Sequence, residues 1–275
     1  MTTRRCSPTE VLGATDQANG AEGPDGAGLS ARLAAAGCVA PDEEARELLA
    51  AAHDPEELEA LVLRREDGEP LAWLTGGVSF CGQWIHVDEG VYVPRWQSEE
   101  MAVAASHSLL LRGRGALAVD LCTGAGAVAC QLRRASPSSS VLGVELDRRA
   151  ARCAARNGVV VLIGDLGDAL ASGCAELVTA VAPYVPSDQL SFLPSDVLRF
   201  EPREALDGGL DGLVIIRAVI ESAVRLLAPG GELFVELGGD QGASASDSLL
   251  AAGFHQIELH ADDEGDLRWL RATKR

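Results

Sequence analysis

The chain has no pair of cysteines in the C-x-x-C spacing, and its seven cysteines are scattered over 275 residues. An odd, scattered set of cysteines argues against a zinc site and against a disulfide framework. The five histidines show no ligand spacing either, so we expect no bound metal. The cysteines are predicted to be small buried hydrophobic residues in a reducing cytoplasm.

Long hydrophobic runs are also missing. Although 47% of the residues are hydrophobic, no uninterrupted stretch is long enough to cross a bilayer. The first residues do not combine a basic segment with an apolar core, so no signal peptide is indicated. Both absences predict a cytoplasmic protein that does not bind membranes.

Positive charge is scarce. The chain has 23 Lys and Arg residues against 41 Asp and Glu residues, which gives a formal net charge of −18. This balance argues against direct nucleic-acid binding, because that binding draws on positive charge. It suits a basic protein partner, although solubility is the simpler explanation. The sequence also lacks G-x-S-x-G and a convincing Ser/His/Asp set, so hydrolysis is not indicated.

The first 95 residues change character twice. Residues 1–28 are rich in small and polar residues without periodicity, which predicts a disordered leader. Residues 29–68 have a helical pattern, with Asp54 and Pro55 as a typical helix start, and predict an N-terminal helical domain. Residues 69–95 alternate and contain glycines, which predicts a β-hairpin linker.

From residue 96 to the end, helical and strand patterns alternate. Helices are expected at 99–111, 125–135, 148–157, 211–228 and 241–252. Strands are expected at 116–121, 140–146, 159–163, 176–182, 231–237, 254–261 and 267–273. Such alternation is typical of an open α/β sheet with right-handed crossovers.

A small-residue turn stands between the first of these strands and its helix, in A-V-D-L-C-T-G-A-G-A-V-A-C at 118–130. Small residues let the backbone approach a ligand closely. Asp120 ends the strand, where it would repel a phosphate and would suit a cationic amino group. Glu145 ends the next apolar run, 25 residues later, where a carboxylate binds ribose hydroxyls. Together they favour S-adenosylmethionine (SAM) over a dinucleotide.

A third carboxylate follows the strand V-V-V-L-I, in Gly164-Asp165-Leu166. Since the carboxyl ends of parallel strands meet at one crevice, Asp120, Glu145 and Asp165 are predicted to line a single cleft. Asp165 is placed to accept a hydrogen bond from an adenine amino group. Taken alone, Asp165 is equally well explained as an exposed loop residue.

The segment T-A-V-A-P-Y-V-P at 179–186 resembles the S-N-P-P-Y-I-P motif of HemK/PrmC-like protein-(glutamine-N5) methyltransferases, which are class I SAM-dependent methyltransferases. Three further blocks share this resemblance, which covers about residues 30–275: G-E-P-L-A-W-L-T-G-G-V-S-F-C-G at 68–82, V-D-E-G-V-Y-V-P-R at 87–95 and F-E-P-R-E-A-L-D-G-G-L-D-G-L at 200–213. It implies a Rossmann-like, seven-stranded catalytic domain at 96–275, after a small helical domain and a hairpin linker.

The resemblance also implies the site. The expected cofactor is SAM, held by Asp120, Cys122, Thr123, Gly124, Ala125, Gly126, Glu145, Asp165, Leu166 and Val181. The substrate would meet Val181, Ala182, Pro183 and Tyr184, of which Val181, Pro183 and Tyr184 would be catalytic. No metal is implied.

The chain departs from the family where the acceptor is bound. Val181 stands at the asparagine position, Ala182 at the first proline, and Cys122 at the first loop glycine. The family asparagine would hydrogen-bond the substrate carboxamide, and losing one such partner costs about 1–3 kcal/mol. The family's P-R-P-E-T-E is Pro94–Glu99 here, so Gln97 or Ser98 is a candidate replacement for the lost hydrogen bond.

Three functions are therefore open. The first is methylation of a protein glutamine, with a release factor or a ribosomal protein as partner. The second is SAM-dependent methylation of a small molecule or of another nitrogen. The third is a non-catalytic scaffold that binds SAM.

Overall fold

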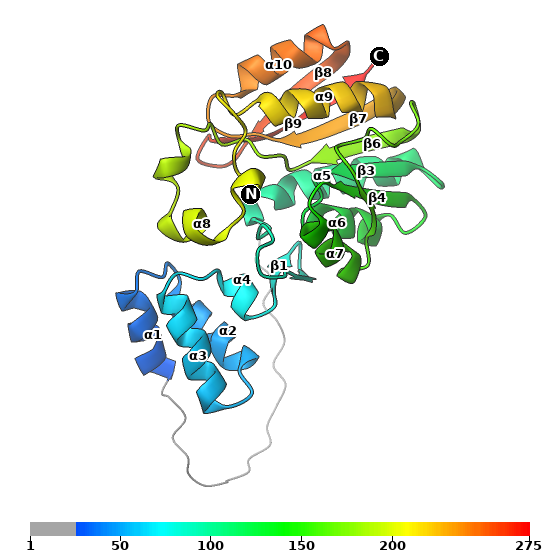
Figure 1. The fold of residues 1–275 in the computed structure, drawn as a ribbon. Coiled ribbons are helices and arrows are strands. Elements are labelled where there is room, and N and C mark those ends of the chain that lie inside the picture. The colour runs from blue at the N-terminus through cyan, green and yellow to red at the C-terminus, as the bar shows by residue number, and fades with distance from the viewer. Residues whose placement is uncertain (1–25) are drawn as a thin grey trace, which may run out of the picture.

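The computed structural model describes residues 26–275 (Figure 1). The chain begins with three packed helices, α1 (Gly26–Ala35), α2 (Pro41–Ala51) and α3 (Pro55–Glu66). Asp54 caps α3, because its side chain accepts the Glu57 N–H at 2.8 Å. Leucines from all three helices form a small core of their own. Residues 26–28, assigned to the leader from the sequence, are helical, and the rest of that leader lies outside the described residues.

The predicted hairpin is shorter than expected. Its strands are β1 (Gly77–Phe80) and β2 (Gln83–His86), which pair antiparallel. The short helix α4 (Leu71–Leu74) precedes them, and an extended segment leads from them to a 3-10 turn at Trp96–Ser98. Along residues 26–275, no helix has the length and apolar character needed to cross a membrane.

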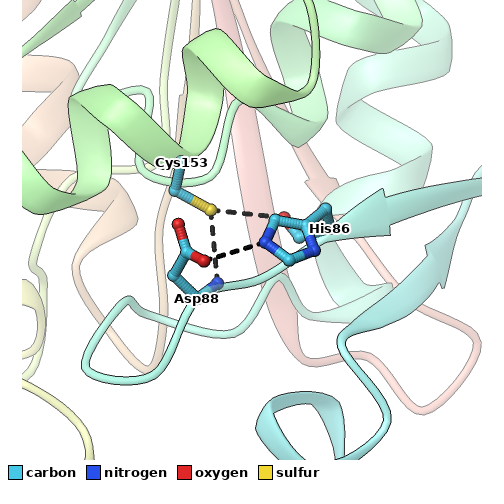
Figure 2. A group of neighbouring side chains, drawn as sticks. All are labelled: His86, Asp88 and Cys153. Atoms are coloured by element: carbon cyan, nitrogen blue, oxygen red, sulfur yellow. Dashed lines mark hydrogen bonds and ion pairs between the residues drawn. The ribbon is translucent and has the colours of Figure 1, made fainter. Parts of the chain in front are cut away.

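A polar joint fixes the linker to α7 (Arg148–Arg156) (Figure 2). His86 Nε2 and Asp88 Oδ1 are 2.8 Å apart, the Asp88 N–H donates to the Cys153 thiol at 3.4 Å, and that thiol donates to the His86 carbonyl at 3.3 Å. Arg156 adds an ion pair to Asp88 at 2.5 Å.

The ligand atoms of His86, Asp88 and Cys153 lie within 4.8 Å of one another, a grouping that spacing along the chain does not reveal. Each of the three side chains already has a protein partner, and the Arg156 guanidinium neutralises the negative charge of Asp88. The group therefore acts as a hydrogen-bonded joint between linker and helix.

A seven-stranded sheet forms the main body, in the order β5-β4-β3-β6-β7-β9-β8. The parallel strands are β3 (Leu117–Leu121), β4 (Ser140–Glu145), β5 (Val160–Ile163), β6 (Ala175–Ala180) and β7 (Leu227–Glu236). Strand β9 (Leu267–Lys274) runs antiparallel to both of its neighbours, β7 and β8 (Phe254–Ala261), so β8 points the same way as the first five strands. The predicted α/β fold class is confirmed.

Helices cover both faces of the sheet (Figure 1). One face carries α5 (Glu99–Arg112), α6 (Ala127–Ala135) and α7, and the other carries α9 (Val214–Leu226) and α10 (Gly242–Ala251). Because side chains alternate along a strand, Ala118 packs toward α5–α7 and Val119 toward α9. By the same alternation Asp120, Thr179 and Glu236 belong to the α5–α7 face.

The segment between β6 and α9 contains a helix that the sequence did not predict, α8 (Ser195–Phe200). It faces the N-terminal helices (Figure 1). Arg199 forms an ion pair with Asp67 at 2.6 Å, and the rings of Phe200 and Trp73 meet edge-on with centroids 6.4 Å apart. The N-terminal unit is thus attached to the segment that follows the acceptor motif.

Candidate functional site

The loop at 122–126 is a tight turn with three residues in the left-handed region. Cys122 has φ +54°, Gly124 +57° and Gly126 +85°. A Cβ on Gly126 would lie 2.8 Å from a methyl of Val159, so this position needs glycine for space as well as conformation. The Thr123 N–H donates to the Val144 carbonyl at 3.1 Å, which ties the turn to β4.

Asp120 is more deeply placed than the sequence suggested. Its carboxylate is 2% exposed and accepts the Thr123 hydroxyl at 2.5 Å and the Thr179 hydroxyl at 2.6 Å. Burial raises its pKa to about 6, although both hydroxyls oppose that shift. Asp120 therefore fixes the loop to β6, and its contact with a cationic amino group stays a prediction that relies on its remaining lone pairs.

The other two carboxylates lie at the same edge of the sheet. Glu145 accepts the Gly124 N–H at 2.8 Å and the Asp147 N–H at 3.0 Å, so it supports the loop directly. Asp165 is exposed just after β5. The pKa of the Cys122 thiol is raised first by burial and then by the charges of Glu145, Asp120 and Asp165. The three carboxylates thus act on one loop residue, whereas the predicted cleft that all three would line stays a prediction, because Glu145 and Asp165 do not line the pocket that borders the loop.

A pocket opens between the loop, the start of α6, the linker and the end of β6. Its lining residues are Phe80, Tyr92, Pro94, Ser98, Asp120, Cys122, Thr123, Gly124, Ala125, Ala127, Val128 and Val181. The pocket therefore joins the predicted cofactor loop to the first residue of the predicted acceptor motif.

The other residues of the acceptor motif, Ala182–Tyr184, lie outside the pocket lining. Ala182 is 2% exposed and packs in the core on the α9 side, whereas Pro183 is half-buried. Tyr184 is also half-buried, packs against the same core, and has its carbonyl bound by the Gln241 amide at 2.7 Å. None of Ala182, Pro183 and Tyr184 lines the pocket, so their predicted contact with substrate stays a prediction.

The D-G-G-L-D-G element supports this motif through its backbone. The Gly208 N–H donates to the Val185 carbonyl at 2.8 Å, and the Val185 N–H donates to the Leu206 carbonyl at 3.0 Å. A Cβ on Gly208 would lie 2.8 Å from the Pro183 carbonyl. Glycine at 208 therefore permits two stretches of main chain to lie in contact.

Known proteins share both the sequence and the fold. No protein-family model matches the chain. A release factor glutamine methyltransferase of Mycolicibacterium smegmatis is 35% identical over 271 residues, covering 89% of this chain and 95% of that protein. One from Thermodesulfovibrio yellowstonii is 32% identical, covering 76% and 77%.

The chain belongs to the release factor glutamine methyltransferase family. It is a SAM-dependent methyltransferase. A 4-amino-L-phenylalanine/4-methylamino-L-phenylalanine methyltransferase of Streptomyces pristinaespiralis is 40% identical, covering 70% of this chain and 69% of that protein. Among solved structures, the catalytic domain of hMettl16 matches with a TM-score of 0.54 at 13% identity over 80% of this chain and 81% of that one, a likeness of fold alone.

Two buried acidic groups of this methyltransferase were missed as site residues. Glu201 forms an ion pair with Arg95 and accepts the Val93 N–H at 3.3 Å, and Arg95 also lies over the Tyr92 ring, 5.2 Å from its centroid. Burial raises the pKa of Glu201 while Arg95 opposes the shift. Glu201 thus fixes the linker segment that forms one pocket wall.

Glu236 is the second of these groups. It is 2% exposed at the end of β7, accepts the Ser98 hydroxyl and interacts with the Tyr184 hydroxyl. The signal that could have found it is the one that marked Asp120 and Glu145, an acidic residue at the end of an apolar strand.

Proposed function

We propose that this methyltransferase methylates the side-chain amide nitrogen of a glutamine in a protein, with a release factor or a ribosomal protein as partner. The observation that supports it is the pocket in which Cys122 and Val181 share a wall. In the sheet register, Leu121 pairs with Ala180, so Cys122 and Val181 follow side by side. Donor and acceptor segments therefore meet across one strand spacing.

The residues present fit SAM. The left-handed loop leaves room for a ligand against Gly124, where a Cβ would meet nothing within 4 Å. Glu145 and Asp165 stand at adjacent strand ends for the ribose and the adenine, and Asp120 adds negative charge beneath the loop. When bound, SAM supplies a methyl group already activated by its sulfonium.

An amide nitrogen is a weak nucleophile, so the protein must contribute orientation and stabilise charge on the nitrogen. In this chain the Val181 carbonyl and the rigid Pro183 are left to do so, with Tyr184 held by Gln241. The acidic surface suits a basic protein substrate.

A second candidate acceptor is the nitrogen of a small molecule. Two observations favour it. Val181 offers no polar side-chain atom to a carboxamide, and the relative that is 40% identical bears the name of an aminophenylalanine methyltransferase.

Methyl transfer from radiolabelled SAM to a release factor, to a glutamine-containing peptide and to 4-amino-L-phenylalanine separates the candidates. Labelling of the glutamine alone supports the proposal, and labelling of the amino acid alone overturns it in favour of the second candidate. Val181→Asn should raise the rate on the glutamine peptide by about ten- to a hundredfold, because it restores a partner worth about 1–3 kcal/mol. An unchanged rate would count against a carboxamide acceptor.

Calorimetric titration with SAM tests the cofactor half. Asp165→Ala is the suitable variant because Asp165 is exposed, whereas Asp120→Ala would leave two buried threonine hydroxyls without their acceptor. Weaker SAM binding by a fully folded Asp165→Ala protein is the expected result.

A further inference from the structure

A buried carboxylate stands beside the position where the family has its asparagine. In the register of β6 and β7, Thr179 pairs with Phe234 and Ala180 with Val235, so Val181 and Glu236 come next. Glu236 lies on the α5–α7 face of the sheet, the face that the pocket borders. Cys122, Val181 and Glu236 therefore follow one another across the carboxyl edge of three strands.

Ser98 connects this carboxylate to the pocket. It lines the pocket, is 4% exposed, and donates its hydroxyl hydrogen to Glu236 Oε2. Because that hydrogen is held by Glu236, the free lone pairs of Ser98 Oγ remain for a donor in the pocket. Ser98 thus presents a hydrogen-bond acceptor where Val181 presents none.

We propose that Ser98 and Glu236 form the proton-accepting pair of the acceptor site, taking the N–H that the side chain at 181 does not receive. The inference rests on the proposed function in one respect, that the acceptor atom is a nitrogen carrying hydrogen.

The proton balance is the same for an amide and an amine. The nitrogen forms a bond to the methyl carbon, the carbon–sulfur bond breaks, and the donor leaves as neutral S-adenosylhomocysteine. The methylated nitrogen then gives one proton to Ser98 Oγ, and the hydroxyl proton of Ser98 passes to Glu236 Oε2. Glu236 ends as a neutral carboxylic acid, the form that a buried site favours.

The surroundings of Glu236 suit this role. Burial raises its pKa, and the Ser98 and Tyr184 hydroxyls and the charges of Arg268 and Arg95 oppose that rise. The pKa of Tyr92, on the linker side, is likewise raised by burial and then by the charge of Glu236, while Arg95 opposes the rise. Glu236 must be ionised to accept a proton, so transfer should slow as pH falls through its raised pKa.

The same strand offers a matched control. Glu232 lies four residues earlier on the same face, is 3% exposed, and accepts the hydroxyl of Ser108 from α5. It is held further by Arg112 and Arg271, and neither it nor Ser108 lines the pocket. Ser108→Ala therefore removes a hydroxyl from a second buried serine–glutamate pair, one that lies away from the acceptor and is also held by two arginines.

Binding tests the pair without turnover. The chain has two tyrosines, and both interact with this region, so protein labelled at tyrosine Cζ gives two NMR reporters. The protein is saturated with S-adenosylhomocysteine and titrated with 4-amino-L-phenylalanine and with a glutamine-containing peptide. Ser98→Ala should weaken the affinity of the probe that binds by about fivefold or more, the loss expected for one hydrogen bond, and Ser108→Ala should not. Equal affinities, or no response in the wild-type protein, overturn the inference.

Steady-state kinetics test whether Glu236 accepts the proton. Glu236→Gln keeps the acceptor for Ser98 but cannot take a proton, so it should lower kcat by about a hundredfold and abolish the fall in rate at low pH. Glu236→Asp should recover part of the rate, and Glu232→Gln should keep the wild-type pH profile. A Glu236→Gln enzyme with wild-type kcat and pH profile overturns the pair while leaving the proposed function intact. A wild-type enzyme that binds SAM and a probe but transfers no methyl fails the proposed function, and the affinities of Ser98→Ala and Ser108→Ala still decide the pair.

Discussion

The two halves of the pocket differ in how their polar groups are held. On the cofactor side, Asp120 and Glu145 are bonded to loop residues 3 and 21 positions away, and the Asp120 bond to Thr179 spans 59 residues. On the acceptor side, Glu201 and Glu236 are bonded to Arg95 and Ser98, more than 100 residues away. The cofactor half is therefore mainly a local structure with one long-range bond to β6, whereas the acceptor half is assembled from the linker, β6, β7 and the segment around α8.

The difference explains where substitution is tolerated. The cofactor loop needs glycine at 126 for space, because a Cβ there would lie 2.8 Å from Val159, whereas Cys122 in the same loop carries a side chain at φ +54°. The acceptor wall holds its shape through buried contacts behind the surface, so a side chain facing the pocket, such as that of Val181, is free to vary.

The largest expected loss of stability comes from a substitution in the acceptor half. Arg95→Met leaves Glu201 as an unpaired buried charge, which should lower the free energy of unfolding by about 3 kcal/mol. Arg199→Met removes an ion pair whose side chains are both 58% exposed, and should cost much less, because water screens both charges. Urea unfolding of both variants measures the difference. Equal losses would show that the acceptor half does not depend on its buried pair.

A smaller loss of stability is expected from substitutions in the loop of the cofactor half. Gly126→Ala places a methyl group against Val159 and Ala154 in a left-handed conformation, so it should destabilise the protein by about 2 kcal/mol or more. Gly124→Ala has the same conformational strain but open space, so it should cost about 1 kcal/mol. Thermal unfolding followed by circular dichroism compares them. A larger loss of stability from Gly124→Ala than from Gly126→Ala would show that Gly126 is not the tightly packed position of the loop.

The smallest effect is a pH dependence within the cofactor half. The folded-state pKa of Asp120 is raised to about 6, so the folded protein binds this proton more tightly than the unfolded chain. Asp120 therefore favours folding at low pH, and that contribution is lost as pH rises through about 6. Relative to Asp120→Asn, the wild-type protein should lose about 1 kcal/mol of stability between pH 5 and pH 7.

Asp211→Asn is the control for this measurement. Its pKa is lowered by a hydrogen bond from Arg217, so its contribution is lost only as pH falls toward that lowered pKa. Its difference from the wild-type protein should be flat between pH 5 and pH 7. A flat profile for Asp120→Asn as well would mean that the Asp120 carboxylate keeps an ordinary affinity for its proton.

Periodicity located the sheet because the strands around Asp120, Glu145 and Thr179 are short apolar runs ended by polar residues. The helix predicted at 211–228 begins only at Val214, since Gly208–Gly212 is bound to the acceptor motif by backbone contacts that no periodicity records. Helix α8 has only six residues, too few to show a helical periodicity in the sequence, and it is held in place by contacts with Asp67 and Trp73.

The site was predictable to the extent that it is local. The strand-end rule predicted that Asp120, Glu145 and Asp165 line one cleft. All three act on the Cys122 thiol, but only Asp120 of the three lines the pocket, so the shared cleft stays a prediction. The rule did not reveal that Asp120 is buried beneath two threonine hydroxyls, because Thr179 is 59 residues away. The sequence predicts Ser98 as one candidate replacement for the missing asparagine, but its partner Glu236 lies 138 residues further on, beyond the reach of any local pattern.

The attachment of α8 gives the N-terminal helices a mechanical path to the acceptor. Asp67, at the end of α3, holds Arg199, and Glu201 two residues later holds Arg95 at the foot of the turn that carries Ser98. The linker makes a second connection, because the Asn157 side chain bonds both the His86 backbone and the Ala125 carbonyl of the loop at 122–126. The N-terminal helices are thus connected to both halves of the pocket, through α8 to the acceptor side and through the linker to the cofactor loop.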